Sequence, residues 1–287
     1  MRPELIEASG LLRSPDPAAM ERALALLQKT VFSFSMKVCG HREDAEDTMQ
    51  DVLFKSLPHL RKIENPQALA VWLYKVTRNR CWMSRRKSRF APEHTLSLDE
   101  LMPEPAELEA LLHTAVHSPE AQAISNQNAE QLHQAVQRIP AKYRLILVLH
   151  DMEELSAAEV AKITGLQEGT VRVRLHRARL FVRRELAALA SGKTRATTKP
   201  SQRSNARRSV DCKRIFAGLS DYMDDTLDEA TCTRFRDHIQ DCAPCVAFLE
   251  DLSRAVERCR TSEVPCESTS ARALRKVLLQ EYQRLTA

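Results

Sequence analysis

The sequence predicts an all-α protein, and two observations lead to this prediction. Helix-forming residues dominate the composition, whereas only 6 of the 287 residues are glycine and 5% are aromatic, which disfavours a fold of strands and tight turns. Apolar residues also recur with a helical period in most segments that carry them. At this length we expect two or three domains, each with its own core.

Hydropathy predicts a protein that stays in the cytoplasm. The longest apolar run, LILVL at 145–149, is much shorter than the ~20 residues of a membrane span. The first ten residues lack the apolar core of a signal peptide. In the cytoplasm the eight cysteines would be mostly reduced, which favours metal binding or redox sensing over a disulfide framework.

The net charge of +5 is distributed in blocks. Residues 61–89 carry nine Lys or Arg and one Glu, and residues 168–184 carry six Arg and one Glu. Between them, residues 91–124 carry seven Asp or Glu and no Lys or Arg. Two basic blocks separated by an acidic one indicate two contacts with an anionic polymer.

The first helices follow from apolar spacing and helix-stop signals. A helix is expected from Asp16 to about Cys39, because Pro17 suits a first turn and Gly40 a C-terminal stop. Two more are expected at about 43–57 and 66–89. Four of the thirteen prolines and most of the acidic block fall within 91–119, so this segment is predicted to be a linker.

The second half of the chain continues as helices around another linker. Helices are expected at about 119–138, 140–152, 156–164 and 167–189. Residues 191–210 contain six basic residues and no acidic ones, which predicts a second linker. A small domain is expected from 211 to about 260. The last segment, about 269–286, is predicted to be an amphipathic helix with the apolar residues Leu274, Val277, Leu278 and Leu285.

The segment LSAAEVAKITGLQEGTVRVRLHRARLFV, at 155–182, has the pattern of a helix-turn-helix. Ser156 is a suitable N-cap, Gly165 is a helix stop, and a second helix opens near Glu168. A solvated arginine face is the alternative, but the preceding helix and turn argue against it. With Val171, Leu175, Ala178 and Val182 in the core, the helical period turns four residues toward DNA: Arg172, Val173, His176 and Arg177.

The helix expected at 66–89 combines aromatic and basic side chains. Trp72 shares a face with Leu69, Leu73 and Val76, so it is expected to pack in the core rather than to stack on a base. The aromatic residues are Trp72, Tyr74 and Trp82, and the basic ones are Lys75, Arg78, Arg80, Arg85, Arg86 and Lys87. Stacking surfaces beside phosphate partners are typical of proteins that bind single-stranded nucleic acid.

The stretch HIQDCAPC, at 238–245, supplies three metal ligands: His238, Cys242 and Cys245. Ligands at i and i+4 lie on one helix face, and C-x2-C places two thiolates around one turn. Zinc takes four such ligands, and the residues alone leave the fourth open among Cys212, Cys232, Cys259 and Cys266. Packing of small buried thiols and a thioredoxin-like redox pair are the alternatives, but no βαβ pattern supports the second.

Two parts of the chain resemble one bacterial family. IPAKYRLILVLHDMEELSAAEVAKITGLQEGTVRVRLHRAR, at 139–179, resembles region four of the extracytoplasmic-function (ECF) sigma factors. HREDAEDTMQDVLFKSL at 41–57 and NPQALAVWLYKVTRNRCWMSRRKSR at 65–89 resemble region two of that family, in the same order. The resemblance covers about residues 16–187. It implies a transcription initiation factor that is not an enzyme and whose partners are core RNA polymerase and promoter DNA.

The resemblance assigns roles to three groups of residues. An acidic surface at a helix start would dock on the polymerase through Asp44, Glu46, Asp47, Gln50 and Asp51, with helix capping and solubility as the alternative role. The promoter's minus-ten element would be captured and melted by Lys62, Ile63, Asn79, Arg80, Arg85 and Arg86. The minus-thirty-five element would be read by Arg172, Val173, His176 and Arg177.

Residues 212–245 are similar to a zinc-binding anti-sigma domain, whose usual pattern is Cys or His, a gap of about 25 residues, and H-x3-C-x2-C. This resemblance selects Cys212 as the fourth ligand beside His238, Cys242 and Cys245. It implies one Zn²⁺, with a structural or regulatory role. Such a domain normally belongs to a separate inhibitor protein, whereas here it follows the sigma regions in one chain.

The sequence therefore predicts an ECF-type sigma factor that a C-terminal zinc domain regulates in cis, in response to redox or metal state. The expected fold is two helical sigma domains, the region-two bundle and the region-four helix-turn-helix, plus a small helical zinc-binding domain. The expected boundaries are region two at 1–90, an acidic linker at 91–119, region four at 120–190, a basic linker at 191–210, and the zinc-binding anti-sigma-like domain at 211–287.

Two other functions remain open at this point. The first is a one-component helix-turn-helix DNA-binding regulator with a zinc sensing or dimerisation domain. The second is a sigma-shaped scaffold whose C-terminal domain binds another regulator. Region-two residues argue against the first, because a simple repressor or activator needs no polymerase-binding surface.

Overall fold

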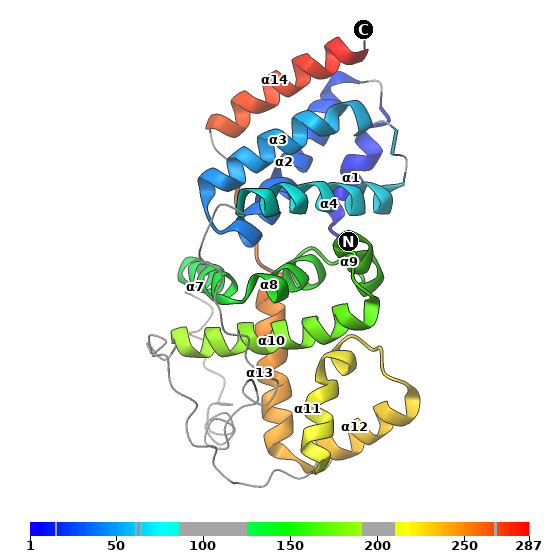
Figure 1. The fold of residues 1–287 in the computed structure, drawn as a ribbon, viewed down its shortest axis with the longest axis vertical. Coiled ribbons are helices and arrows are strands. Elements are labelled where there is room, and N and C mark those ends of the chain that lie inside the picture. The colour runs from blue at the N-terminus through cyan, green and yellow to red at the C-terminus, as the bar shows by residue number, and fades with distance from the viewer. Residues whose placement is uncertain are drawn as a thin grey trace. The chain divides into compact units, whose positions relative to one another are not determined.

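The computed structural model describes residues 1–14, 16–60, 62–63, 65–85, 101, 125–190, 210–266 and 269–286. Within these ranges every regular element is a helix, which confirms the predicted all-α class (Figure 1). The two segments predicted as linkers, 91–119 and 191–210, lie outside the described residues except at Leu101 and Val210. The chain divides into two compact units, one of residues 1–91, 148–171 and 262–287 and one of 92–147 and 172–261.

The first unit contains four helices from the N-terminal part of the chain: α1 (Pro3–Leu11), α2 (Pro17–Cys39), α3 (Arg42–Leu60) and α4 (Pro66–Arg85). Helix α2 begins where the Asp16 carboxylate accepts a hydrogen bond from the Ala18 amide at 3.0 Å, which satisfies a free N–H of the first turn. It ends at Gly40, whose φ of 85° lies in the left-handed region that glycine adopts without a steric penalty.

Helix α1 was not predicted from the sequence. Its side chains Leu5 and Ala8, together with Leu12 just after it, are buried, and their spacing of three and four residues is that of one helix face. The segment is short and contains Gly10, so its own helix signal is weak, and packing against α2 and α4 stabilises it.

A π-helical turn, η2 (Val148–Met152), and helix α9 (Ala157–Thr164) also belong to the first unit. Ser156 and Glu159 form a capping box, in which each side chain accepts a hydrogen bond from the other residue's backbone N–H, at 3.2 Å and 2.8 Å. Gly165 ends α9 with a φ of 73°. Val160 and Ile163 of α9 are buried, and the predicted cap and stop of this helix are confirmed.

Helix α14 (Thr269–Thr286) closes the first unit by lying along α2 and α3 (Figure 1). Its buried side chains are Ala271, Leu278 and Tyr282, whereas Val277 is 48% exposed. The buried face therefore differs from the predicted one. Leu278 is buried as predicted, but Tyr282 rather than Val277 packs against the neighbouring helices.

The second unit contains α7 (Ser125–Arg138), α8 (Ala141–Leu147), most of α10 (Glu168–Ala190), α11 (Val210–Met223), α12 (Glu229–Asp241) and α13 (Ala243–Arg260). Leu175, Ala178 and Val182 of α10 are buried as predicted. Near them Phe181 stacks on Tyr143 of α8, with ring centroids 5.4 Å apart.

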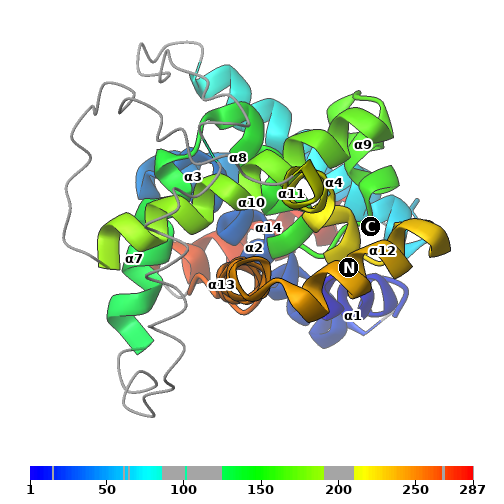
Figure 2. The same ribbon diagram turned by 90° about the horizontal axis from the view of Figure 1, so that it is seen from below.

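Helices α11, α12 and α13, which we call the zinc-finger helices, pack closely on one another. Figure 2 shows α12 leading directly into α13. A Cβ atom at Gly218 of α11 would lie 2.9 Å from the Phe235 ring of α12, so glycine permits this close approach. Tyr222 stacks on the same ring at 5.2 Å, and Phe216 contacts Phe248 of α13 at 5.4 Å. These aromatic contacts fix how the three helices lie against each other.

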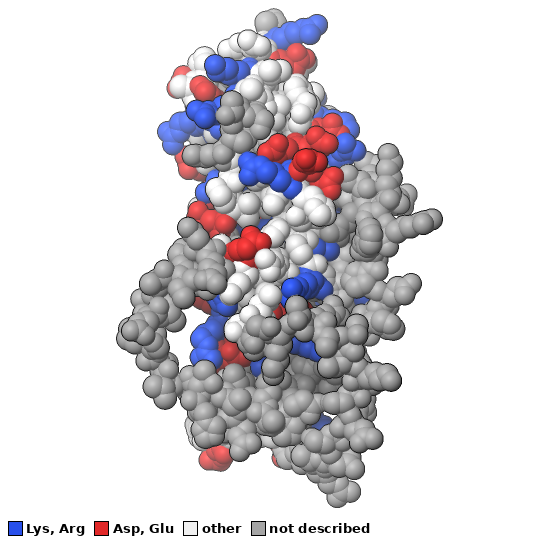
Figure 3. All heavy atoms as spheres, turned by 90° about the vertical axis from the view of Figure 1, so that its left-hand side faces the viewer, with Lys and Arg blue, Asp and Glu red and all other residues white. Residues whose placement is uncertain are grey.

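None of the helices in the described ranges is long and apolar enough to cross a membrane. On the face drawn in Figure 3, the basic and acidic side chains of the described residues are interspersed rather than gathered into one basic field.

Candidate metal centre and nucleic-acid interface

The four predicted metal ligands come together in the second unit. Cys212 lies in the first turn of α11, His238 in the last turn of α12, Cys242 between α12 and α13, and Cys245 in the first turn of α13. Their ligand atoms all lie within 4.8 Å of one another. Each of the four side chains is half-buried. The cluster therefore joins the ends of all three zinc-finger helices.

The distances within the cluster fit a tetrahedral zinc site. With Zn–S bonds of about 2.3 Å and Zn–N bonds of about 2.0 Å, two thiolates should be about 3.8 Å apart, and a thiolate and an imidazole nitrogen about 3.5 Å. Cys212 Sγ lies 3.9 Å from Cys242 Sγ and 3.7 Å from His238 Nε2, and Cys245 Sγ lies 3.3 Å from the same nitrogen. The residues present can therefore hold the ion that the anti-sigma pattern implies.

Electrostatics in the cluster also favour a bound cation. Burial, the hydrogen bond with Cys242 and the neighbouring thiols raise the pKa of Cys245. Three thiols this close cannot all ionise without a compensating positive charge, and a coordinated divalent cation supplies it. Among the other cysteines considered as a fourth ligand, Cys259 is fully buried in α13 and Cys266 lies 3.9 Å from Met49 Sδ in the first unit.

Helix α10, the second helix of the helix-turn-helix, presents its four predicted DNA-reading residues in different environments. Val173 is 59% exposed and Arg172 is half-buried. Arg177 is half-buried and donates to the Tyr143 hydroxyl at 3.2 Å. His176 is only 7% exposed, because Phe216 and Ser220 of α11 cover it. The predicted reading face is thus open at Val173 and closed at His176.

The zinc-finger helices cover one side of α10 through ion pairs that the sequence did not predict. Arg179 is 0% exposed and donates to both carboxylate oxygens of Asp224, at 2.9 Å and 2.7 Å. Arg183 donates to Asp251 of α13 at 2.7 Å and lies over the Phe248 ring, 4.4 Å from its centroid. Both interactions are of the charge-assisted or cation–π kind that gains strength when water is excluded.

A periodic signal could have revealed this second face. Arg172, His176, Arg179 and Arg183 follow spacings of four, three and four residues, which places them on one stripe beside the core stripe. The prediction placed Arg172, His176 and their neighbours Val173 and Arg177 toward DNA and assigned no role to Arg179 and Arg183. A second stripe of this kind equally fits a surface that a neighbouring domain covers.

His176 is held in its neutral form. Burial lowers the pKa of His176 to about 4, with further lowering by the positive charges of Arg179 and Arg177. Its Nδ1 lies 3.3 Å from the Ser220 hydroxyl. A neutral ring suits this position, because a charged imidazole would lie beside two guanidinium groups in a site with little water.

The residues predicted to contact the minus-ten element lie in and before α4. Lys62 and Asn79 are exposed and Ile63 is half-buried. Arg80 forms an ion pair with Asp51 of α3 at 2.7 Å, so a predicted DNA contact and a predicted polymerase contact bind each other here. Arg85 ends α4, but its side chain and all of Arg86 lie outside the described residues.

The remaining predicted polymerase contacts lie along the first half of α3. Asp47 and Gln50 are exposed, and Asp44 and Glu46 are half-buried. Glu46 accepts a hydrogen bond from Arg42 at 3.0 Å, within one helical turn. Exposed carboxylates in the first turns of a helix are favourable with its dipole and accessible to a basic partner.

Comparison with known families identifies three segments. Residues 24–90 match the model "Sigma-70 region 2", residues 129–182 match "Sigma-70, region 4", and residues 212–245 match "Putative zinc-finger". The third match begins and ends at two of the four clustered ligands, Cys212 and Cys245. Together with the cluster geometry, it supports zinc binding by this segment.

Curated relatives are similar over more than half of the chain. The ECF RNA polymerase sigma factor SigW of Bacillus subtilis is 23% identical over 178 residues, which are 62% of this chain and 94% of the relative. The ECF RNA polymerase sigma factor SigM of Mycobacterium tuberculosis is 29% identical over 150 residues, which are 52% of this chain and 68% of the relative. A solved structure, the sigma factor RpoE in complex with the anti-sigma factor NepR from Bartonella quintana, aligns with a TM-score of 0.40 and 21% identity over 57% of this chain and 94% of that one.

Proposed function

Because this chain is a sigma factor of the ECF type, which directs transcription initiation and is not itself an enzyme, we propose that its zinc-finger helices regulate it in cis. In this proposal the chain binds core RNA polymerase through α3 and promoter DNA through α4 and α10, in the cytoplasm. One zinc ion, bound by Cys212, His238, Cys242 and Cys245, holds the zinc-finger helices in their regulatory arrangement.

One observation carries the proposal: the zinc-finger helices cover the face of α10 that contains His176, Arg179 and Arg183. Arg179 and Arg183 bind Asp224 and Asp251, so neither guanidinium is available to a DNA phosphate in this state. Binding to carboxylates and binding to phosphates use the same planar donor geometry. DNA would therefore compete directly with the zinc-finger helices for this side of α10.

The metal cluster is suited to controlling this contact from a distance. Asp224 lies twelve residues after Cys212 along the chain, a separation of about 18 Å at the helical rise of about 1.5 Å per residue. Phe216 and Phe248, whose rings contact each other, lie between the metal ligands and the paired carboxylates along α11 and α13. Loss of the metal would free the ends of α11, α12 and α13 from each other, and Asp224, just after α11, and Asp251 on α13 would lose their common geometry.

Helix α14 supports the same interpretation in the first unit. The Gln28 side chain of α2 donates to the Ala271 carbonyl at 3.0 Å and accepts from Arg275 at 2.8 Å. Leu278 is fully buried there. Helix α14 therefore covers part of α2 and α3, and α3 is the helix that carries the predicted polymerase contacts.

The test is run-off transcription with purified core polymerase. A chain ending at residue 190 is expected to initiate transcription more strongly than the full chain containing zinc, and oxidation or chelation is expected to raise the activity of the full chain toward that level. Equal activity of the two chains under all zinc and redox conditions would refute regulation in cis. If neither the shortened chain nor the full chain enables core polymerase to start transcription at the promoter, a one-component DNA-binding regulator would be favoured instead.

A further inference from the structure

Tyr143 of α8 holds one of the four predicted DNA-reading residues of α10. Its hydroxyl accepts a hydrogen bond from Arg177 Nη1 at 3.2 Å. Both residues belong to the second compact unit, and 34 positions separate them along the chain. The direction of the Arg177 side chain is therefore set from outside its own helix.

The Tyr143 hydroxyl is a rigid acceptor. Tyr143 is only 3% exposed, and its ring stacks on Phe181 of α10 with an interplanar angle of 29°. Lys142 Nζ lies over the same ring, 5.0 Å from its centroid. Arg177 and Phe181 are four residues apart and so lie on one face of α10. Because the ring is fixed on Phe181, its hydroxyl has a defined position beside Arg177, one helical turn away.

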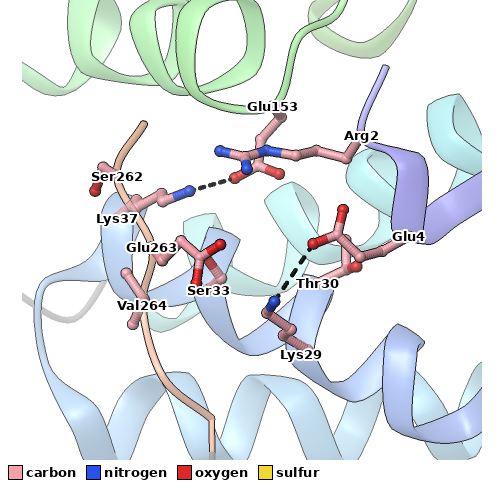
Figure 4. Close-up of a pocket in the computed structure, with 10 residues that line it drawn as sticks. All are labelled: Arg2, Glu4, Lys29, Thr30, Ser33, Lys37, Glu153, Ser262, Glu263 and Val264. Carbon is pink, nitrogen blue, oxygen red and sulfur yellow. Dashed lines mark hydrogen bonds and ion pairs between the residues drawn. The ribbon is translucent and has the colours of Figure 1, made fainter. Parts of the chain in front are cut away.

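The partner of Arg177 differs in charge from the partners of two fully packed cations. Lys37 pairs with the Glu153 carboxylate at 2.9 Å (Figure 4), and Arg179 pairs with the Asp224 carboxylate at 2.7 Å. Tyr143 instead offers a hydroxyl, which accepts one N–H and brings no negative charge. This bond orients the Arg177 guanidinium without neutralising it, which leaves its charge and its other donors for an anionic ligand.

Orientation before binding matters for an arginine that contacts DNA. A long side chain on a helix surface has many rotamers, and a contact with a base edge or a phosphate uses only one of them. Restricting the side chain beforehand removes part of this entropic cost from binding. Arg177 lies one helical turn after Val173, which is 59% exposed, so the oriented guanidinium is on the open stripe of α10.

We propose that Tyr143 is a positioning residue for DNA recognition, whose hydroxyl orients Arg177 before the minus-thirty-five element binds. The inference rests on the proposed function, because it requires α10 to contact DNA through Arg177. In the complex, Arg177 keeps its bond from Nη1 to Tyr143 and uses its remaining N–H groups on the DNA.

The first test is the affinity of the full, zinc-loaded chain for a duplex containing the minus-thirty-five element, measured by fluorescence anisotropy at several salt concentrations. Tyr143→Phe keeps the stacked ring and removes only the hydroxyl, so the affinity is expected to fall about fivefold. The charge at the interface is unchanged, so the slope of log affinity against log salt should stay the same. Arg177→Met removes the charge and should lower the affinity and also reduce the slope by about one.

The matched control is Tyr222→Phe. Tyr222 is also a stacked tyrosine of the second unit, with its ring 5.2 Å from that of Phe235, but it lies on α11 rather than beside Arg177. Its affinity and salt slope are expected to equal those of the unchanged chain.

A double variant separates positioning from a structural role. If Tyr143 acts through Arg177, Tyr143→Phe has no further effect on affinity in a chain that already carries Arg177→Met. An equal loss of affinity in both backgrounds would overturn the proposal, because Tyr143 would then support the fold or contact DNA itself. A higher affinity of Tyr143→Phe would also overturn it, since the hydroxyl would then withhold Arg177 from DNA.

Nitrogen-15 relaxation of the Arg177 Nε–H group gives a readout that needs no DNA. In the free, full chain the order parameter of this group is expected to fall below about 0.6 in Tyr143→Phe and to stay unchanged in Tyr222→Phe. Equal mobility of Arg177 with and without the Tyr143 hydroxyl would overturn the proposal.

The two variants also distinguish failure of this inference from failure of the proposed function. If Arg177→Met binds the duplex as tightly as the unchanged chain, α10 does not read DNA through Arg177, and that part of the proposed function is refuted together with the inference. If Arg177→Met weakens binding and Tyr143→Phe does not, the DNA contact stands and positioning by Tyr143 is refuted.

Discussion

Replacing Asp224 by alanine should detach the zinc-finger helices from α10. The Arg179 guanidinium is 0% exposed, and Asp224 supplies two of its hydrogen bonds at 2.7 Å and 2.9 Å. After Asp224→Ala the buried charge retains a 3.3 Å hydrogen bond to the Ser220 carbonyl. Removing one partner of a buried ion pair costs about 3–5 kcal/mol, because the other charge is left without compensation.

This cost falls on the docking equilibrium between the zinc-finger helices and α10. At about 1.4 kcal/mol per factor of ten, a loss of 3–5 kcal/mol weakens docking on the order of 10² to 10³-fold. The matched control is Glu7→Ala, which removes an ion pair with Arg22 of the same 2.7 Å length whose side chains are 47% and 70% exposed. Such an exposed pair contributes at most about 1 kcal/mol.

Two assays measure the effect. Urea unfolding gives the change in free energy, and fluorescence anisotropy gives the affinity for a duplex containing the minus-thirty-five element. Asp224→Ala should destabilise the full chain and raise its affinity for that duplex, whereas Glu7→Ala should change neither appreciably. The double variant Arg179→Met with Asp224→Leu replaces the pair by apolar side chains and should recover the lost stability. If Asp224→Ala behaves like Glu7→Ala in both assays, the ion pair does not hold the zinc-finger helices on α10.

Three further predictions concern separate parts of the chain. Ser156→Ala removes the cap of α9 and should lower the free energy of unfolding by about 1 kcal/mol, measured by urea titration, while equal stability would contradict the capping role. The pKa of His176 falls from 6.5 to about 4 on folding, so the unfolded chain binds more protons between these values; stability should therefore decline by roughly 3 kcal/mol as pH drops from about 6.5 to about 4. A His176→Gln variant should lose this part of the pH dependence, and an unchanged profile would contradict the assignment. His238→Ala should abolish binding of one zinc per chain in metal analysis of the reduced protein, and equal zinc in both proteins would contradict the ligand set.

Several features of the fold could be predicted because their signals are local. The cap of α9 at Ser156, its stop at Gly165 and the end of α2 at Gly40 depend on residues within one helical turn. Three metal ligands also lie within eight residues, across the short junction between α12 and α13, so little of the rest of the chain is needed to bring them together. Helix α1 was missed for the converse reason: its own sequence is a weak helix former, and contacts with residues far along the chain stabilise it.

The candidate sites show the same division. The sequence could predict that the DNA-reading residues of α10 lie on the side opposite its core residues. It could not predict that α11 buries one of them, His176. No local pattern shows that a polar stripe is covered by another domain, because Arg179 has the same helical preference whether water or Asp224 lies beside it. Cys212 was placed in the metal site through a family resemblance, since 25 residues separate it from His238.

The sequence by itself predicted most of the helices, the candidate metal ligands and the resemblance to the sigma regions, because each depends on residue chemistry within a few turns of helix. The tertiary structure alone decided which of these surfaces are covered. Lys37 and Glu153 are 116 residues apart, and Arg179 and Asp224 are 45 apart. Their pairing depends on how distant helices exclude water from the same small volume, and neither residue's local sequence contains that information.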